Sequence, residues 1–291
     1  MSIEERHTHV PIAGSPLHVV ETGDPLGRPV LFLHGWPESW RTWRGVMEAA
    51  GTDARLLAVD LPGIGDSTGP APGGSKLRLA GMVHELVLSL GLTDLTLVGH
   101  DAGGMIAYAY LRRYGAARVV IMNTVIPGVA PWKDVLANPY IWHFGFHAVP
   151  ALPETLVRGR QAAYFDYFYD VLSVDPARIT PESRRAHAAA YARDTALTAG
   201  FDLYRALPQD ALDNAALAEA GPGRHTPPLP AGRRRGRRHH RLRPGLQGGR
   251  RPAAGHRADP RCRPLRPGGG TRPGLEAHSR LHQVTGSSRT P

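Results

Sequence analysis

A carboxylate in a glycine-rich turn is the feature of this sequence that most directly suggests chemistry. Residues 99–104 are Gly-His-Asp-Ala-Gly-Gly and follow the apolar run Leu95-Thr96-Leu97-Val98. When a strand turns sharply into a helix, glycines are needed where a Cβ would clash, and such a nucleophile elbow presents its central residue above the sheet. Backbone N–H groups at the helix start would surround Asp101, which could attack an electrophilic alkyl carbon and form an ester. Taken alone, the motif fits an ordinary glycine-rich turn equally well.

A second loop could complete this site. The apolar run Val30-Leu31-Phe32-Leu33 leads directly into His34-Gly35-Trp36-Pro37. A loop of this type places a backbone N–H group, here that of Trp36, opposite the N–H of Ala102, the residue after the nucleophile. Two such donors form an oxyanion hole. We therefore predict an oxyanion hole made by Trp36 and Ala102 beside Asp101.

The segments around these motifs alternate between strand and helix patterns. Short apolar runs predict strands at residues 30–33, 56–60, 95–98 and 119–122. Helical spacing of apolar residues predicts helices at 82–90, which Gly91 ends, and at 105–114. Alternation at this spacing predicts an α/β fold with a mostly parallel sheet and helices on both faces.

Four motifs, in this order along the chain, resemble those of one enzyme family. They are His34-Gly35-Trp36-Pro37-Glu38-Ser39-Trp40, Asp60-Leu61-Pro62-Gly63-x-Gly65-x-Ser67, Gly99-His100-Asp101-x-Gly103-Gly104 and Asn123-Thr124. On these motifs, residues 15–210 resemble the α/β-hydrolase fold, and within it the epoxide hydrolases and the related haloalkane and haloacid dehalogenases. The resemblance implies that Asp101 is the nucleophile and that Trp36 and Ala102 supply the oxyanion hole. It also implies a core over residues 1–127 and a helical cap over 128–214. The Arg-, Pro- and Gly-rich composition of residues 215–291 sets them apart as a third segment.

The cap segment is rich in aromatic residues, most of which we expect to pack against one another. Epoxide hydrolases use cap tyrosines to protonate the oxygen of the opening ring, and the resemblance implies this role for Tyr204. The position expected for a first such tyrosine is occupied by His143, which resembles the halide-pocket histidine of fluoroacetate dehalogenases. The predicted substrate pocket comprises His34, Pro37, His100, His143 and Phe144.

Two alternatives to an epoxide hydrolase stay open. The first is a haloalkane or haloacid dehalogenase. Fluoroacetate dehalogenases carry arginines just after the nucleophile, whereas this chain has Ala102 and the uncharged run Gly104-Met105-Ile106 there. Asn123-Thr124 also resembles the epoxide hydrolases more, so we favour a small apolar epoxide over an organohalide as substrate. The second alternative is a protein of this fold that binds a small molecule and does no chemistry.

Composition changes abruptly near residue 221. Residues 221–291 contain 17 arginines, no lysine and two acids, for a formal charge of +15, whereas residues 1–220 carry −5. This segment also lacks Phe, Trp, Tyr, Ile and Met. It cannot bury enough apolar surface to offset its ordering entropy, so we predict disorder and the absence of the family's last two strands. The family's catalytic Gly-His and its partner acid are not recognisable here, and Gly255-His256 follows no apolar strand.

An alternative reading frame accounts for this composition. When the gene is read one base later, the present amino acids fix the first and third bases of each new codon. The middle base of each new codon stays largely free. Residues 226–249 then permit PLLYLRGDAEGGDITDYVQGFRAA, and residues 259–282 permit IPGAGHFAPEEAPDQVWKHIRDFI. Because the second string resembles the family's Gly-His-Phe motif, we predict a frameshift near residues 221–226 and impaired catalysis. The other interpretation, an arginine-rich nucleic-acid-binding segment, lacks aromatic residues for base stacking, so no specific nucleic-acid partner is predicted.

The remaining features set broad limits. The 291 residues suit one hydrolase domain with its cap, and the single Cys262 allows no internal disulfide, as expected in the cytoplasm. We expect no signal peptide, no membrane span, no metal site and no cofactor. Without two further strands, the strand at 119–122 would form an open sheet edge. Such an edge favours homodimers or aggregation.

Overall fold

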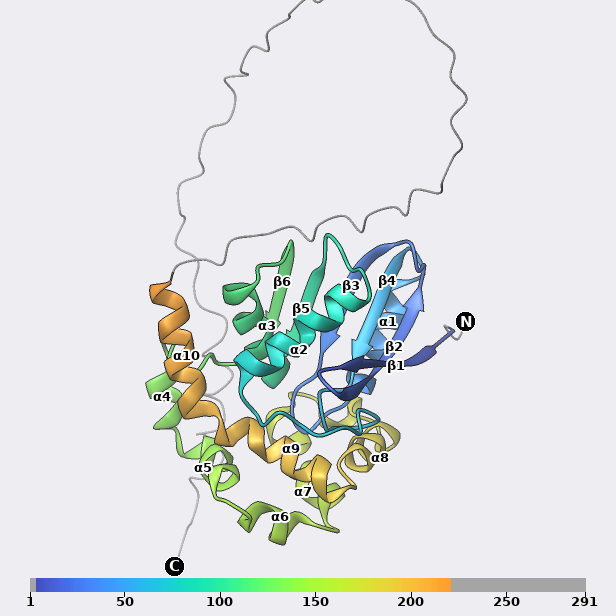
Figure 1. Cartoon of the computed structure of the whole chain (residues 1–291). Coiled ribbons are helices and arrows are strands. Elements are labelled where there is room, and N and C mark those ends of the chain that lie inside the picture. Colours follow the sequence, from blue (N-terminus) through green and yellow to red (C-terminus); the bar gives the residue numbers. More distant parts are fainter. Residues whose placement is uncertain (1–3, 221–291) are drawn as a thin grey trace, which may run out of the picture. The chain divides into compact units, whose positions relative to one another are not determined.

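The computed structural model describes residues 4–220, which belong to one compact unit. Within these residues, strands form a single mixed sheet in the order β1-β2-β4-β3-β5-β6 (Figure 1). The strands are β1 (Arg6–Ile12), β2 (Ser15–Gly23), β3 (Arg28–Leu33), β4 (Ala54–Val59), β5 (Thr96–His100) and β6 (Arg118–Met122). The helices packed on the sheet are α1 (Arg44–Ala50), α2 (Lys76–Ser89) and α3 (Ala102–Arg113), with the short 3₁₀ helix η1 (Trp40–Trp43) before α1.

The sheet topology brings the two predicted site loops together. Strands β4, β3, β5 and β6 are parallel, whereas β1 and β2 form an antiparallel hairpin that adds to β4. In the β3–β5 pairing Leu33 lies opposite Gly99, so the loops after these strands leave the same edge of the sheet side by side. Carboxyl ends of neighbouring parallel strands are where ligands bind in such sheets.

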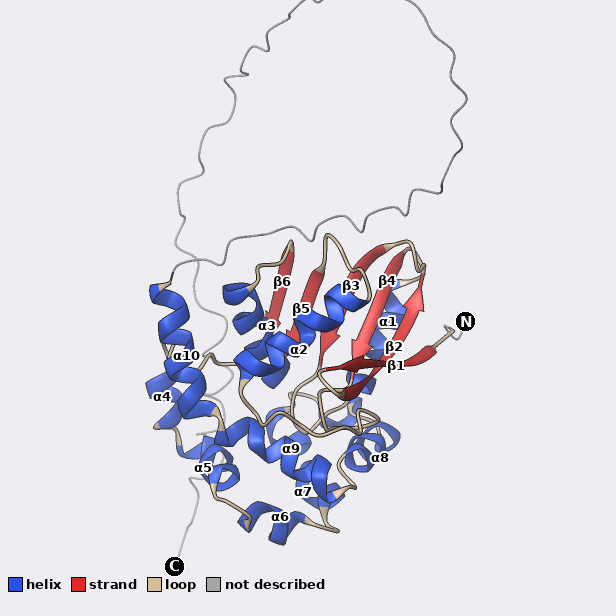
Figure 2. Cartoon of the chain, viewed as in Figure 1, coloured by secondary structure: helices blue, strands red, loops and turns tan. Residues whose placement is uncertain are grey.

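The sheet is covered on both faces, as predicted from the alternating pattern (Figure 2). Helices α2 and α3 pack on one face through the larger apolar cluster, which includes Leu31, Leu97 and Ile106. On the other face, η1 and α1 cover a smaller cluster that includes Phe32 and Trp43, whose rings lie 5.0 Å apart. Alternate residues of one strand serve opposite faces, so Leu31 and Phe32 enter different clusters.

A helical region follows β6 and lies beyond the carboxyl ends of the strands (Figure 1). Its elements are α4 (Trp132–Leu136), η2 (Pro139–Ile141), α5 (Trp142–Ala148), α6 (Leu152–Val157), α7 (Gln161–Leu172), η3 (Pro176–Arg178), α8 (Pro181–Ala190), α9 (Asp194–Arg205) and α10 (Leu207–Glu219). Helix α10 continues past residue 214, the predicted end of the cap. The division into a core, a cap and a third segment stays a prediction. No helix among the described residues is long and apolar enough to cross a membrane.

Strand β6 is an edge of the sheet within residues 4–220. It pairs with β5, and its apolar side chains Val120, Ile121 and Met122 are 42%, 38% and 38% exposed. The open edge predicted at 119–122 is therefore present in the described residues, whereas homodimerisation or aggregation through it stays a prediction. The predictions for residues 221–291, including disorder, the frameshift and the histidine at 256, lie outside the described residues.

Candidate active site

Asp101 occupies a strained position between β5 and α3. Its backbone has φ +49° and ψ −120°, a conformation that few residues other than glycine adopt. The carbonyl of Asp101 accepts the N–H groups of Gly104 at 2.9 Å and Met105 at 3.1 Å, so the helix begins at once after the turn. The predicted sharp turn from β5 into α3 is therefore present, with Asp101 at its centre.

Glycines allow the surrounding backbones to approach Asp101. A Cβ added to Gly35 would lie 2.5 Å from the Asp101 Cβ and 2.8 Å from its Oδ2. A Cβ on Gly103 would meet the backbone of Leu33 and His34 at the end of β3. The glycines at these two positions thus let the loop after β3 pack directly against the elbow.

Two backbone N–H groups bind the carboxylate. The Trp36 N–H donates to Asp101 Oδ2 at 2.8 Å, and the Ala102 N–H also hydrogen-bonds the carboxylate. Burial raises the pKa of Asp101, and these two N–H groups and the charge of His100 only partly oppose that rise. The backbone N–H groups of Trp36 and Ala102 therefore both lie beside the Asp101 carboxylate; their role as an oxyanion hole stays a prediction.

A carboxylate–histidine pair supports the loop that carries Trp36. Glu38 Oε2 accepts the Gly35 N–H at 3.2 Å and His100 Nδ1 at 3.0 Å, and its Oε1 accepts the Thr42 hydroxyl at 3.0 Å. Burial would raise the pKa of Glu38, but the hydrogen bond and charge of His100 lower it to about 2. Burial likewise opposes protonation of His100, yet Glu38 raises its pKa overall. Glu38 belongs to the motif after β3, but the motif does not indicate that Glu38 contacts His100, 62 residues further along the chain.

The aromatic side chains of the cap cover this edge. The Tyr204 ring on α9 lies 5.5 Å from the Trp36 ring, 5.8 Å from His143 and 5.3 Å from Phe144. Burial, and next the negative charge of Asp101, raise the pKa of Tyr204 well above 10. No hydrogen bond joins the Tyr204 hydroxyl to another residue in the described part of the chain. Tyr204 is therefore a protonated, unpartnered donor that experiences the charge of Asp101.

Two buried histidines on α5 lie among these rings without a positive charge. Burial lowers the pKa of His143 to about 4 and that of His147 to about 2. Each has a buried Nδ1 without a partner in the described residues. His147 lies 4.5 Å from the Trp36 ring and bonds the Tyr164 hydroxyl at 2.7 Å. The sequence motifs indicate His143 but not His147, which lies one helical turn further on, on the same face of α5.

The other predicted pocket residues are tied into the loops. His34 is fully buried, its Nδ1 lies 2.8 Å from the Gly35 carbonyl and its Nε2 accepts the Leu61 N–H at 3.0 Å. Burial accordingly lowers its pKa. The Pro37 carbonyl accepts the hydroxyl of Tyr169, on α7, at 2.7 Å, which joins the cap to this loop.

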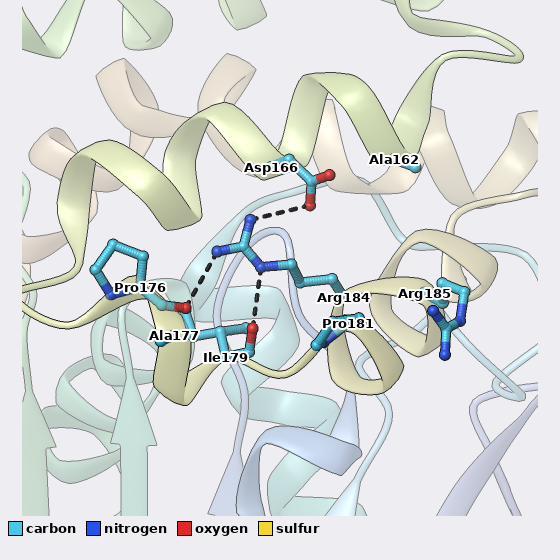
Figure 3. Close-up of a pocket in the computed structure, with 8 residues that line it drawn as sticks. All are labelled: Ala162, Asp166, Pro176, Ala177, Ile179, Pro181, Arg184 and Arg185. Atoms are coloured by element: carbon cyan, nitrogen blue, oxygen red, sulfur yellow. Dashed lines mark hydrogen bonds and ion pairs between the residues drawn. The ribbon is translucent and has the colours of Figure 1, made fainter.

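Two other features of the described residues lie apart from Asp101. Figure 3 shows a surface pocket between α7, η3 and α8, and its lining includes neither Asp101 nor Tyr204. Its Arg184 already binds Asp166 and the carbonyls of Pro176 and Ile179.

His18, Asp60 and Asp66 have potential metal-ligand atoms within 4.8 Å of one another. However, Asp60 accepts hydrogen bonds from His18, the Trp40 N–H and the Asp66 N–H, as expected of a structural carboxylate.

A mostly parallel sheet with a carboxylate at a strand-to-helix elbow, two backbone donors and a following helical region is typical of the class of the α/β hydrolases. The alpha/beta hydrolase fold family matches residues 28–157. The solved structure of Cfl2 from Burkholderia cenocepacia is 31% identical, with a TM-score of 0.68, and the match covers 75% of this chain and 76% of that one. The epoxide hydrolase CorEH is 29% identical with a TM-score of 0.66, over 74% and 78% of the two chains. This chain belongs to the α/β-hydrolase family.

Curated relatives point to one branch of that family. The soluble epoxide hydrolase of Corynebacterium sp. (strain C12) is 39% identical over 152 residues, which cover 50% of this chain and 52% of the relative. Epoxide hydrolase 3 of Xenopus tropicalis is 28% identical over 216 residues, 67% of this chain and 56% of the relative. The chain thus spans about half the length of these curated relatives. The resemblance to epoxide hydrolases inferred from the motifs is confirmed.

Proposed function

We propose that this chain opens small apolar epoxides by forming an ester on Asp101. The observation that carries the proposal is the 2.8 Å hydrogen bond from the Trp36 N–H to Asp101 Oδ2. It holds Oδ2 in place, and in this proposal Oδ1 is the attacking atom. The new bond joins Oδ1 to the less hindered ring carbon, and the bond from that carbon to the epoxide oxygen breaks.

The opening ring needs a proton, and Tyr204 supplies it in this proposal. An alkoxide forms as the ring opens and takes the proton of the Tyr204 hydroxyl. The raised pKa of Tyr204 keeps that proton in place at neutral pH. His143 lies next to Tyr204 and, as a neutral imidazole, can hold the epoxide oxygen with a ring N–H.

Release of the product requires water to hydrolyse the ester, and we propose that this second step is impaired. A base must remove a proton from that water. The low pKa values of His143 and His147 make them weak bases, and His100 is held by Glu38. The family's histidine and acid correspond to segments beyond residue 220, in the alternative reading frame described above. The ester on Asp101 is therefore expected to accumulate.

Intact-mass measurement after incubation with styrene oxide tests the proposal. We expect one adduct per chain, mapped to Asp101 by peptide sequencing, and no adduct in Asp101→Asn. Tyr204→Phe should slow adduct formation by about 10²-fold or more, because it removes the proton donor. Tyr110→Phe is the matched control, since the Tyr110 hydroxyl contacts His84 on α2 at 3.2 Å and has no assigned role. Reversible binding of the epoxide without an adduct would instead support a non-catalytic binder.

A dehalogenase is the second candidate. The Trp36 Nε1–H is buried without a partner in the described residues, and its ring lies 4.5 Å from that of His147. An indole N–H is a donor only, so an anion such as a departing halide could accept it. Asp101 alkylation by neutral organohalides, with no reaction toward epoxides, would move the assignment to this class.

A further inference from the structure

A buried ion pair lies outside the site described so far. Lys76, the first residue of α2, and Asp210, on α10, are each 2% exposed. Asp210 accepts the Lys76 backbone N–H through Oδ1 at 2.8 Å and the Lys76 ammonium through Oδ2 at 2.9 Å. Burial lowers the pKa of Lys76 and raises that of Asp210, while each partner opposes the shift of the other. Burying such a pair costs free energy, so it adds little net stability over a well-packed apolar pair.

The ammonium of Lys76 also donates to the carbonyl of Leu203. Leu203 lies in the last turn of α9, where helix carbonyls lack N–H partners from their own helix, and the next residue is Tyr204. The loop before α2 approaches the same turn, since a Cβ on Gly74 would clash with the backbone of Asp202 and Leu203. The start of α2 therefore contacts the backbone on the N-terminal side of Tyr204.

We propose that Lys76 and Asp210 are positioning residues that fix the α9–α10 turn and thereby hold the Tyr204 hydroxyl over Asp101. The ammonium holds the Leu203 carbonyl, and Asp210 holds the ammonium from the first turn of α10. This inference rests on the proposed ring-opening function. It adds that proton delivery by Tyr204 depends on a lysine that makes no hydrogen bond to Asp101 and only experiences its charge through space.

Adduct formation from two electrophiles distinguishes a loss of Tyr204 positioning from general damage to the site. Styrene oxide needs a proton as its C–O bond breaks, whereas benzyl bromide loses bromide, which needs none. Both transfer a carbon to Asp101 Oδ1. In Lys76→Met of the full chain, we expect adduct formation from styrene oxide to slow by about 10–100-fold, part of what a proton donor contributes. Adduct formation from benzyl bromide at Asp101 should keep the wild-type rate.

Arg112→Met is the matched control. The Arg112 guanidinium donates to the Leu217 carbonyl at 3.0 Å, an equivalent contact at the far end of α10. We expect wild-type rates with both electrophiles. Should Lys76→Met not fold, Lys76→Met/Asp210→Leu removes both charges at once and takes its place, with the same expectation.

Equal slowing of both electrophiles, or an unchanged rate with styrene oxide, would overturn the positioning role. Selective loss of the epoxide reaction in the lysine variant supports it. A wild-type chain that forms no Asp101 adduct with either electrophile would overturn the proposed function, and this inference with it. The two proposals can be distinguished, because the role of Lys76 is judged only against a wild-type chain that forms the Asp101 adduct.

Discussion

Replacing Gly35 with alanine is expected to displace the proposed nucleophile from its donors. The added Cβ would lie 2.5 Å from Asp101 Cβ and 2.8 Å from Oδ2, the oxygen that accepts the Trp36 N–H. Carbon atoms in contact normally lie about 3.5–4.0 Å apart, so one group must move by roughly 1 Å. Asp101 is also constrained by its strained backbone, so its side chain has little room to yield without losing the hydrogen bond.

The magnitude follows from this geometry. A misplacement of about 1 Å costs on the order of 10²-fold in rate. Overpacking a filled site costs about 1–3 kcal/mol of folding free energy. We therefore expect Gly35→Ala to form the styrene oxide adduct on Asp101 about 10²-fold more slowly and to unfold at lower denaturant concentration.

Intact-mass kinetics and urea unfolding measure both effects, with Gly45→Ala as the control. A Cβ on Gly45 would meet nothing within 4 Å, and Gly45 lies in the first turn of α1. Alanine restricts the unfolded chain more than glycine does, so this variant should be at least as stable as the wild type and labelled normally. Wild-type labelling and stability in Gly35→Ala would refute the close approach of this loop to Asp101.

Further predictions concern charge at the site and the open edge. Asp101→Asn should be more stable at pH 7, because burial raises the pKa of Asp101 and its ionised form opposes folding. This gain should shrink as the pH falls towards 3.8, the ordinary carboxyl pKa, and should be absent below it, in urea titrations at a series of pH values. Glu38→Gln should lose about 1–3 kcal/mol at pH 7, because His100 and the loop lose an ionised acceptor. That loss should shrink as the pH falls from 4.5 towards 2, since the lowered pKa of Glu38 stabilises the folded chain only while Glu38 is ionised. Bromoacetate should alkylate Asp101 far more slowly than benzyl bromide, because a second carboxylate meets the charge of Asp101; equal rates would favour a haloacid substrate. Val120→Lys, on exposed β6, should reduce self-association in sedimentation experiments.

Local patterns predicted the strands of the site because the sequence of each strand is an apolar run followed by a turn. The predicted strands at 30–33, 95–98 and 119–122 correspond to β3, β5 and β6 within two residues at either end. Helix α2 begins at Lys76, earlier than the predicted residue 82, because its first turn buries a lysine that breaks the apolar spacing. The hairpin of β1 and β2 was not predicted, since β1 carries exposed polar residues and turns at Ala13-Gly14 with weak turn signals.

The site was predictable only where its residues are close to a motif. Trp36, Asp101 and Ala102 come together because each follows directly from the end of a strand, and β3 and β5 are neighbours. Glu38 contacts His100, which lies 62 residues further along the chain. Lys76 contacts Leu203, which lies 127 residues further along. No pattern in a single sequence specifies such pairs, because they depend on how loops and cap pack on the finished sheet.

The charges near Asp101 suit a neutral substrate better than a charged one. Tyr204 holds its proton, and burial leaves His143 uncharged at neutral pH. The cation of Lys76 is already bound by Asp210 and the Leu203 carbonyl. A substrate carboxylate would therefore meet the buried negative charge of Asp101 while the Lys76 ammonium is already occupied. An uncharged epoxide acquires its negative charge only as the ring opens, and in the proposed function Tyr204 then supplies a proton to that oxygen.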